Sequence, residues 1–430
     1  MQTDILIVGS GCSGLYCALH LPKDKKITII TKADAESNDS FLAQGGICVQ
    51  RDDDDFDSFL EDTLKAGHYE NDRESVAIMI NSSRDVIADL VSYGVEFSRD
   101  ENGEFNYTRE GAHSQKRILF HRDITGKEIT SKLLAEVKSR ENITILENTT
   151  LLDIIESDGE CVGAVIADRS GEIFTVSTEY TVLASGGIGG LYRHTTNFRH
   201  LTGDAIAIAA LHGVELKNMN YIQIHPTTFY TDKPAERSFL ISESVRGEGA
   251  KLYNKAMERF TNELLPRDLL VKEIERQMKE DGTDFVWEDL RTIPRDELFG
   301  HFPNIVEYCK KNDYDVTEEC IPVVPAQHYF MGGIKVDHNS KTSMQGLYAV
   351  GETACNGVHG RNRLASNSLL ECLVFAKRAA FDMRDKPRKA SALPGVNLET
   401  YKDREELREK YSKIVFDEIE KANKGDMKNV

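Results

Sequence analysis

Three glycines near the start of the chain constrain the fold more than any other feature. Gly9, Gly11 and Gly14 follow a short apolar run, ILIV (5–8), and overlap the start of an apolar helical stretch that continues as LYCALHL (15–21). Between a strand and a helix, the spacing G-x-G-x-x-G allows a tight turn and lets the backbone approach a pyrophosphate at the helix N-terminus. The sequence therefore predicts a parallel α/β sheet that binds a dinucleotide. The residues predicted to bind it in this loop are Gly9, Ser10, Gly11, Cys12, Ser13 and Gly14.

The end of the second strand favours FAD over NAD as this dinucleotide. A strand that binds the ribose of NAD ends in an acid, whereas KKITIIT (25–31) is followed by Lys32. Two later strands also run into glycine turns, TVLASGGIGG (181–190) and GLYAVGET (346–353), and the second turn contains Glu352. FAD is long and is held across one domain, so it uses turns that a simple NAD enzyme does not need. An NAD-dependent dehydrogenase is the alternative that these features disfavour.

The charge of the chain and its cysteines exclude several other classes of protein. The formal net charge is -18, which argues against nucleic acid or an anionic membrane as a partner. No run approaches the roughly 18 apolar residues that a membrane-spanning helix needs. The eight cysteines show no metal-ligand spacing. This pattern predicts a reduced, cytoplasmic protein without a metal site.

A change of composition along the chain predicts two domains and a C-terminal helix. Residues 221–330 are charged and carry many of the prolines, whereas GLYAVG (346–351) returns to the strand-and-glycine pattern of the first part. We therefore predict an α/β fold in which a Rossmann-like FAD-binding domain (1–220 and 331–390) is interrupted by an α+β capping domain that contributes to the substrate site. The remaining residues, 391–430, are predicted to form a short C-terminal helical segment.

Seven short blocks of sequence, in order along the chain, together resemble one enzyme family. They are SFLAQGGI (40–47), TREGAHSQKRI (108–118), QIHPT (223–227), ISESVRGEG (241–249), LPRD (265–268), PAQHYFMGGI (325–334) and HGRNRLASNSLLE (359–371). With these blocks, residues 1 to about 385 are similar to the succinate dehydrogenase/fumarate reductase flavoproteins, and within them to the members that oxidise L-aspartate. The resemblance implies FAD-dependent oxidation of L-aspartate to iminoaspartate, with oxygen or fumarate as electron acceptor, as the first step of de novo NAD biosynthesis.

Other functions are compatible with parts of this pattern. A soluble fumarate reductase or succinate oxidase with non-covalent FAD would act on the same four-carbon dicarboxylates, fumarate and succinate. A flavin-binding scaffold without substrate chemistry would have no use for the arginines and histidines of the blocks. The resemblance further implies a functional link to quinolinate synthase. Longer members of the family continue into a three-helix bundle, so the C-terminal segment is expected to be truncated relative to them.

The resemblance also implies that residues from several parts of the chain bind FAD. Besides the glycine loop, these residues are Lys32, Asp39, Ser40, Phe41, Leu42, Ala43, Gln44, Gly45, Gly46, Asp204, Glu352, Ser368 and Leu369. Backbone amides at Gly45 and Gly46 can approach the isoalloxazine ring because glycine has no side chain. Asp39 occupies the position at which succinate dehydrogenases carry the histidine that is linked to the flavin. An aspartate cannot make that link, which predicts one non-covalent FAD per chain.

Basic residues of the blocks would bind the substrate, according to the same resemblance. Arg363 and Arg246 would bind a carboxylate of the dicarboxylate, because the guanidinium fork matches carboxylate geometry. His225 and His328 would donate hydrogen bonds to the second carboxylate, and the hydroxyl of Ser242 would also contact the substrate. The predicted substrate site therefore combines residues of both domains.

Arg267 and Glu110 have separate roles in this interpretation. Arg267, in the block LPRD, matches the family's catalytic residue for proton transfer. Glu110 is the only acid in a basic stretch, YTREGAHSQKRILFHR (107–122). L-Aspartate differs from succinate by an ammonium group, which arginine and histidine repel and a carboxylate attracts. The resemblance therefore implies that Glu110 selects L-aspartate, and the alternative is a plain ion pair with Arg109 or Arg117.

Overall fold

A parallel sheet lies at the centre of the flavin-binding part of the computed structural model, which describes residues 1–233 and 237–426. The strand order is β17-β10-β1-β2-β6. The strands are β1 (Ile5–Val8), β2 (Ile27–Ile30), β6 (Ile143–Leu146), β10 (Tyr180–Leu183) and β17 (Leu347–Ala349). All of these strands except the edge strand β6 are buried along their whole length, as expected for a parallel sheet covered on both faces. The predicted Rossmann-like α/β fold is confirmed.

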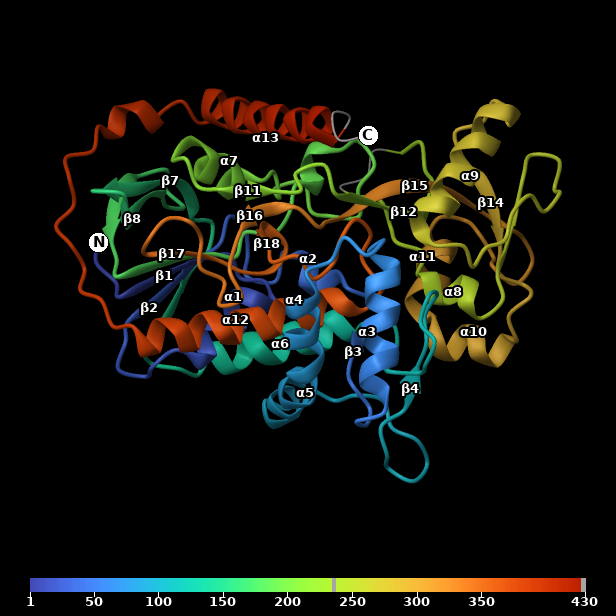
Figure 1. The fold of residues 1–430 in the computed structure, drawn as a ribbon. Coiled ribbons are helices and arrows are strands. Elements are labelled where there is room, and N and C mark those ends of the chain that lie inside the picture. Colours follow the sequence, from blue (N-terminus) through green and yellow to red (C-terminus); the bar gives the residue numbers. More distant parts are fainter. Residues whose placement is uncertain (234–236, 427–430) are drawn as a thin grey trace.

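Alternate residues of β1 point into two different hydrophobic cores. Ile5 and Ile7 pack among residues of α1, α6 and α12 on one face of the sheet. Leu6 and Val8 pack on the other face with residues of α7, β7 and β8. Figure 1 shows α6 and α12 on the opposite side of the sheet from α7 and the β7-β8 hairpin. These elements are α1 (Cys12–His20), α6 (Thr125–Lys138), α7 (Asp204–Leu211), α12 (Asn367–Asp385), β7 (Thr150–Ser157), β8 (Glu160–Ala167) and β9 (Ile173–Ser177), which completes that sheet.

A second unit with its own hydrophobic cluster lies at one end of the molecule (Figure 1). Its sheet has the order β12-β15-β14-β13, and the antiparallel pair β12 and β15 connects it to the flavin-binding part. The elements are β12 (Ile222–Phe229), β13 (Lys251–Tyr253), β14 (Val286–Asp289), β15 (Ile321–Phe330), α8 (Glu243–Gly247), α9 (Arg267–Asp281), α10 (Arg295–His301) and α11 (Pro303–Lys311). This separate core supports the division at residues 221–330, which we keep as a proposal, and we call this unit the cap.

Further short elements complete the fold, and the first of them, α2, contributes residues to the wall of the cavity described below. They are α2 (Asp39–Leu42), β3 (Ile47–Cys48), α3 (Asp55–Ala66), α4 (Arg73–Asn81), α5 (Ser83–Ser92), β4 (Tyr107–Thr108), β5 (Ile118–Leu119), β11 (Leu216–Lys217), β16 (Gly333–Lys335) and β18 (Ala354–Cys355). Two three-stranded sheets, β3-β5-β4 and β11-β16-β18, arise from them. Across the described residues, no helix is long and apolar enough to cross a membrane.

The C-terminal helix α13 (Arg404–Asp426) lies along α7, on the outside of the flavin-binding part (Figure 1). Tyr411 and Val415 are its buried residues, and they belong to the same cluster as α7. A β-carbon on Gly203, the residue before α7, would lie 3.2 Å from a methyl group of Val415. The helix therefore packs directly over the start of α7. Residues 427–430, the end of the predicted C-terminal segment, lie outside the described residues.

We expect Val415→Asp to lower the free energy of unfolding by about 3 kcal/mol or more, because a carboxylate would be buried without a partner. Phe416 is the matched control, since it is the next residue in the helix and is 45% exposed. Phe416→Asp should change the free energy of unfolding by less than about 1 kcal/mol. Denaturant unfolding of the two variants measures this difference, and equal losses would show that α13 does not depend on this contact.

Candidate active site

A single large cavity lies between the carboxyl ends of the parallel strands and the cap, and it encloses about 1780 Å³ including its open mouth. It brings together most of the residues that the sequence predicts. These are Gly9, Ser10, Gly11, Ser13, Lys32, Asp39, Ser40, Leu42, Ala43, Gln44, Gly45, Gly46, Glu110, Asp204, His225, Ser242, Arg267, His328, Glu352, Arg363, Ser368 and Leu369. Four predicted residues do not line it, namely Cys12, Gly14, Phe41 and Arg246. Within residues 1–233 and 237–426, no cluster of acids, histidines and cysteines could hold a metal ion.

The glycine loop has no room for side chains. Gly9 has a φ of +120°, and a β-carbon there would lie 2.1 Å from the carbonyl oxygen of Ala184. A β-carbon on Gly14 would lie 2.2 Å from the carbonyl oxygen of Gly9. Helix α1 begins at Cys12 with Gly11 as its N-cap, and this helix end faces the cavity. Free N–H groups and the positive end of a helix suit a pyrophosphate, so this end of the cavity fits FAD.

A partly exposed ion pair lies in the cavity wall beside the glycine loop. The ammonium of Lys32, directly after β2, lies 2.5 Å from Oδ2 of Asp204, the first residue of α7. Lys32 also donates to the carbonyl oxygen of His200 at 2.9 Å. The pair therefore joins the sheet to α7, the helix that α13 covers.

Two buried carboxyl groups in the cavity wall have polar atoms to offer a ligand. Burial raises the pKa of Asp39 to about 7. Burial also raises the pKa of Glu352 well above its usual value, and the nearby Asp39 raises it further. Oδ2 of Asp39 and Oε1 of Gln44 are buried without a hydrogen-bond partner among the described residues. A buried polar atom without a partner is costly, so these atoms fit a cofactor that carries hydroxyl and N–H groups.

Arg363 lies at the opposite end of the cavity, in the loop before α12. The side chain is 4% exposed, and its guanidinium lies over the ring of Tyr329 at 4.7 Å from the centroid. Nη1 donates to Oγ of Ser368 at 3.3 Å, whereas Nε has no partner among the described residues. Burial, followed by the charge of Arg267, lowers the pKa of Arg363 to about 10. A buried guanidinium with an unused donor is suited to bind a carboxylate.

The two predicted histidines lie side by side on the facing strands β12 and β15. The centroids of His225 and His328 are 5.2 Å apart, with the rings at 69° to each other. Burial and then the charge of Arg267 lower the pKa of each well below its usual value, so both imidazoles are neutral near pH 7. Nδ1 of His328 is 2.7 Å from Oγ1 of Thr196. A neutral imidazole still carries one N–H group, which can donate to a substrate.

Arg267 is held by two partners at the first turn of α9. Its Nε donates to Oε2 of Glu243 at 2.6 Å, and its Nη1 donates to Oε1 of Gln223 at 2.8 Å. Burial acts to raise the pKa of Glu243, but the charges of Arg267 and Arg246 outweigh it and the pKa is lowered. The guanidinium of Arg267 is thus oriented in the cavity wall by a carboxylate and an amide.

Arg246 and Ser242 make contacts that the interpretation based on the sequence did not include. Arg246 is 2% exposed and lies behind the cavity wall, where it donates to Oγ1 of Thr227 and to the carbonyl oxygen of Glu263. Its recorded contacts are therefore within the cap, and they favour a packing role over the predicted substrate contact. Ser242 lines the cavity, but its hydroxyl also caps α8 by accepting from the N–H of Ser244 at 3.3 Å.

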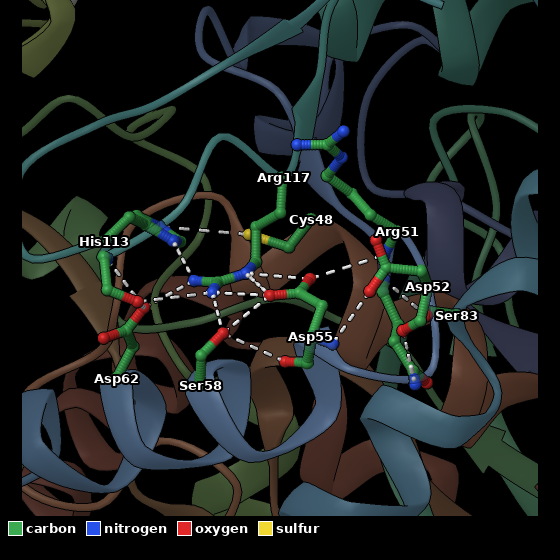
Figure 2. A network of polar contacts seen from close by, with 11 residues as sticks. Cys48, Arg51, Asp52, Asp55, Ser58, Asp62, Ser83, His113 and Arg117 are labelled. Carbon is green, nitrogen blue, oxygen red and sulfur yellow. Dashed lines mark hydrogen bonds and ion pairs between the residues drawn. The ribbon is translucent and has the colours of Figure 1, made fainter.

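The lone acid of the basic stretch, Glu110, lies in the cavity wall and is 6% exposed. Oγ of Ser366 donates to its Oε2 at 2.6 Å, and Oγ of Ser244 donates to its Oε1 at 3.2 Å. No ion pair links it to Arg109 or Arg117 within the described part of the chain; Arg117 instead pairs with two other acids (Figure 2). Glu110 is thus held by hydroxyl groups and faces the cavity.

Sequence reasoning missed several residues of this site although they lie in the quoted blocks. Ser366, Ser244 and Gln223 each orient a predicted residue, and Thr196 contacts His328 from outside the blocks. The available signal was that each of these blocks holds, besides the residue with a predicted role, a further polar residue close to it. Only the tertiary structure shows which neighbour points at which partner.

Comparisons with known proteins show which family the chain resembles. The family FAD_binding_2, described as FAD binding domain, matches residues 4–369. A Clostridium perfringens protein named L-aspartate oxidase is 47% identical over 99% of this chain and 96% of its own length. A protein of the same name from Pseudomonas aeruginosa is 41% identical over 89% of this chain and 74% of its own length. Among solved structures, the FrdA chain of E. coli quinol fumarate reductase matches with a TM-score of 0.84 and 29% identity, covering 95% of this chain and 74% of FrdA.

One conclusion follows from these comparisons, because the family match covers most of the chain and the relatives are well above 30% identical along nearly its whole length. This chain belongs to the FAD-dependent succinate dehydrogenase/fumarate reductase flavoprotein family, the family that includes the L-aspartate oxidases.

Proposed function

We propose that the protein oxidises L-aspartate to iminoaspartate with FAD and that oxygen or fumarate then reoxidises the cofactor. The observation that carries this proposal is the carboxylate of Glu110, which is held by two serine hydroxyls in a cavity that also contains arginines and histidines. The other carboxylate beside them, that of Glu243, is already paired with Arg267. Such a site attracts two carboxylates and one ammonium group. The relatives named L-aspartate oxidase support the same conclusion.

The arrangement assigns each end of the substrate to different side chains. Arg363 binds one carboxylate through its unused donor, and the neutral imidazoles of His225 and His328 donate to the other. Glu110 accepts from the ammonium group on C2. Fixing both ends holds the C2–C3 bond in one orientation, and orientation of this kind can contribute about 7–11 kcal/mol to lowering a barrier.

FAD, when bound, accepts the hydride that the substrate loses. The residues that would hold it are the lining residues of the glycine loop, the segment from Asp39 to Gly46, the pair Lys32 and Asp204, and Glu352. The start of α12, with Ser368 and Leu369, contributes the positive end of a helix. Asp39 has no imidazole to attach the flavin, so we propose that FAD is bound non-covalently.

Arg267 is the proposed proton-transfer residue. Its guanidinium lines the cavity, and its Nε–H points to a carboxylate of Glu243 only 2.6 Å away. A guanidinium cannot accept a proton, so its Nε proton would first pass to Oε2 of Glu243, and the neutral guanidine would then accept the proton that the substrate loses. Gln223 holds the other edge of the guanidinium and fixes its direction.

A soluble fumarate reductase or succinate oxidase is the second candidate, because succinate and fumarate carry the same pair of carboxylates. The fumarate reductase likeness favours it at the level of the fold, whereas Glu110 has no ammonium to bind in those substrates. We further propose a cytoplasmic role that links the product to quinolinate synthase. The eight free, buried cysteines support a reducing compartment.

Anaerobic mixing of the FAD-loaded protein with L-aspartate or succinate tests this function. We expect L-aspartate to bleach the flavin absorbance within the time of an assay and succinate to do so at least about 10-fold more slowly, because only L-aspartate fills the Glu110 contact. Bleaching by succinate alone would establish the second candidate instead. A protein that binds no FAD would contradict both.

Glu110→Gln should raise the KM for L-aspartate by about 10-fold to 100-fold, because a charge-assisted hydrogen bond to the ammonium becomes a neutral one. Fumarate reduction by the same variant should change by less than about 3-fold, since fumarate has no ammonium. Steady-state kinetics with both substrates measure this ratio. Equal losses with L-aspartate and fumarate would mean that Glu110 has a structural role only.

Arg363→Lys should lower kcat/KM for L-aspartate and for fumarate by about 100-fold or more, because a lysine cannot bind a carboxylate through two parallel N–H groups. Arg361 offers a matched control two residues away, since it is half-exposed and pairs with Glu70 and Asp426 at the surface. Arg361→Lys should keep both activities within about 2-fold. Similar kinetics for the two variants would exclude Arg363 as the carboxylate ligand.

A further inference from the structure

The basic stretch around Glu110 contains an arginine that is completely buried and does not face the cavity. Arg117 is 0% exposed, and its guanidinium is enclosed by acids and a hydroxyl of helix α3 (Figure 2). Nη2 donates to Oδ1 of Asp55 at 2.8 Å, Nη1 donates to Oδ2 of Asp62 at 2.5 Å, and Nη2 also donates to Oγ of Ser58 at 2.8 Å. Arg117 is therefore anchored to α3 from several directions.

The same guanidinium fixes the proton position of His113. Nη1 of Arg117 lies 3.2 Å from Nδ1 of His113, and an arginine N–H can only donate. Burial lowers the pKa of His113 below its usual value, although the hydrogen bond to Ala365 and the charge of Glu110 act to raise it, so the ring is neutral and carries one proton. Nδ1 must accept, which leaves that proton on Nε2. Nε2 lies 3.0 Å from the carbonyl oxygen of Ala365 and therefore donates to it.

Ala365 precedes a residue with an unusual backbone. Ser366 has a φ of +62°, in the left-handed region that serine rarely adopts, and it caps α12. Its carbonyl oxygen accepts from the N–H of Cys48 at 3.1 Å. His113 and Cys48 thus hold the peptide groups on either side of Ser366. The conformation of Ser366 is fixed from outside the residue itself.

This conformation points the hydroxyl of Ser366 at Glu110. The N–H of Gly46 donates to Oγ of Ser366 at 3.2 Å, so the hydroxyl proton is left to point elsewhere. It points to Oε2 of Glu110, 2.6 Å away. A continuous set of contacts therefore runs from α3 through Arg117, His113 and the backbone before Ser366 to one oxygen of Glu110.

We propose that Arg117 and His113 are positioning residues that set the direction of the Glu110 carboxylate and, through it, the preference for a substrate with an ammonium group. The proposal rests on the function proposed above. It explains why a basic stretch surrounds one acid: the arginine and the histidine act on the carboxylate through the neighbouring loop. A purely structural role would make the same residues matter equally for every substrate.

His113→Leu tests this proposal, because it removes the N–H donor to Ala365 while leaving Glu110 and Ser366 in the chain. We expect the KM for L-aspartate to rise about 10-fold, with less than about 3-fold change in fumarate reduction or in the binding of succinate followed by flavin absorbance. His113→Gln keeps an N–H donor and should recover most of the lost affinity. Arg117 is left intact so that the anchor on α3 is preserved.

His20→Leu is the matched control, since His20 is a mostly buried imidazole (its side chain is 11% exposed) whose Nδ1 lies 2.9 Å from the carbonyl oxygen of Tyr16, away from the cavity. It should lower stability without changing the ratio of the two activities. If His113→Leu does not fold, Ser366→Ala is the second variant. It removes the hydroxyl that donates to Glu110 and should give the same selective loss.

Two outcomes would overturn the proposal in different ways. Equal losses with L-aspartate and fumarate in both His113→Leu and Ser366→Ala would reduce the two residues to a structural role. A wild-type protein that does not oxidise L-aspartate would remove the proposed function and this inference together. Wild-type oxidation of L-aspartate with a selective loss in the variants supports both.

Discussion

The backbone of Gly9 lies so close to Ala184 that any β-carbon would sit 2.1 Å from its carbonyl oxygen. This contact lets β1 end directly beside β10, and helix α1 begins at the turn that follows. The carboxyl ends of the parallel strands then open into one cavity, as is usual for ligand sites in sheets of this kind. The shape of the cavity beside the start of α1 depends on this turn, in which any residue other than glycine at position 9 would clash with Ala184.

Burial determines the chemistry at the substrate end of the cavity. Burial, more than any single charge, lowers the pKa values of His225, His328 and Arg363. Neutral imidazoles can donate hydrogen bonds beside two arginines without adding further positive charge. The proposed dicarboxylate site therefore gains no positive charge from its histidines, and we propose that the carboxylate of Glu110 distinguishes an amino acid from its deaminated analogue.

Much of this could be predicted from the sequence because the signals were local. The glycine spacing and apolar strands predicted the sheet, and most of the predicted site residues line the cavity. The direction of buried side chains could not be predicted. Arg246 turns into the cap, and Arg117 pairs with Asp55 and Asp62, more than 50 residues away in the chain. Such partners meet only after the fold forms. The basic stretch around Glu110 therefore could not show that Arg117 pairs with acids of α3 and does not line the cavity.

The two hydroxyls on Glu110 come from different parts of the molecule, Ser366 from the flavin-binding part and Ser244 from the cap. The carboxylate therefore accepts hydrogen bonds from both units, across the boundary at which a protein engineer would exchange one cap for another. A chimera that combined this flavin-binding part with the cap of a relative lacking a hydroxyl at the position of Ser244 would leave one oxygen of Glu110 without its donor. Exchange of caps would then alter which substrate is accepted, even though every residue of the flavin-binding part was retained.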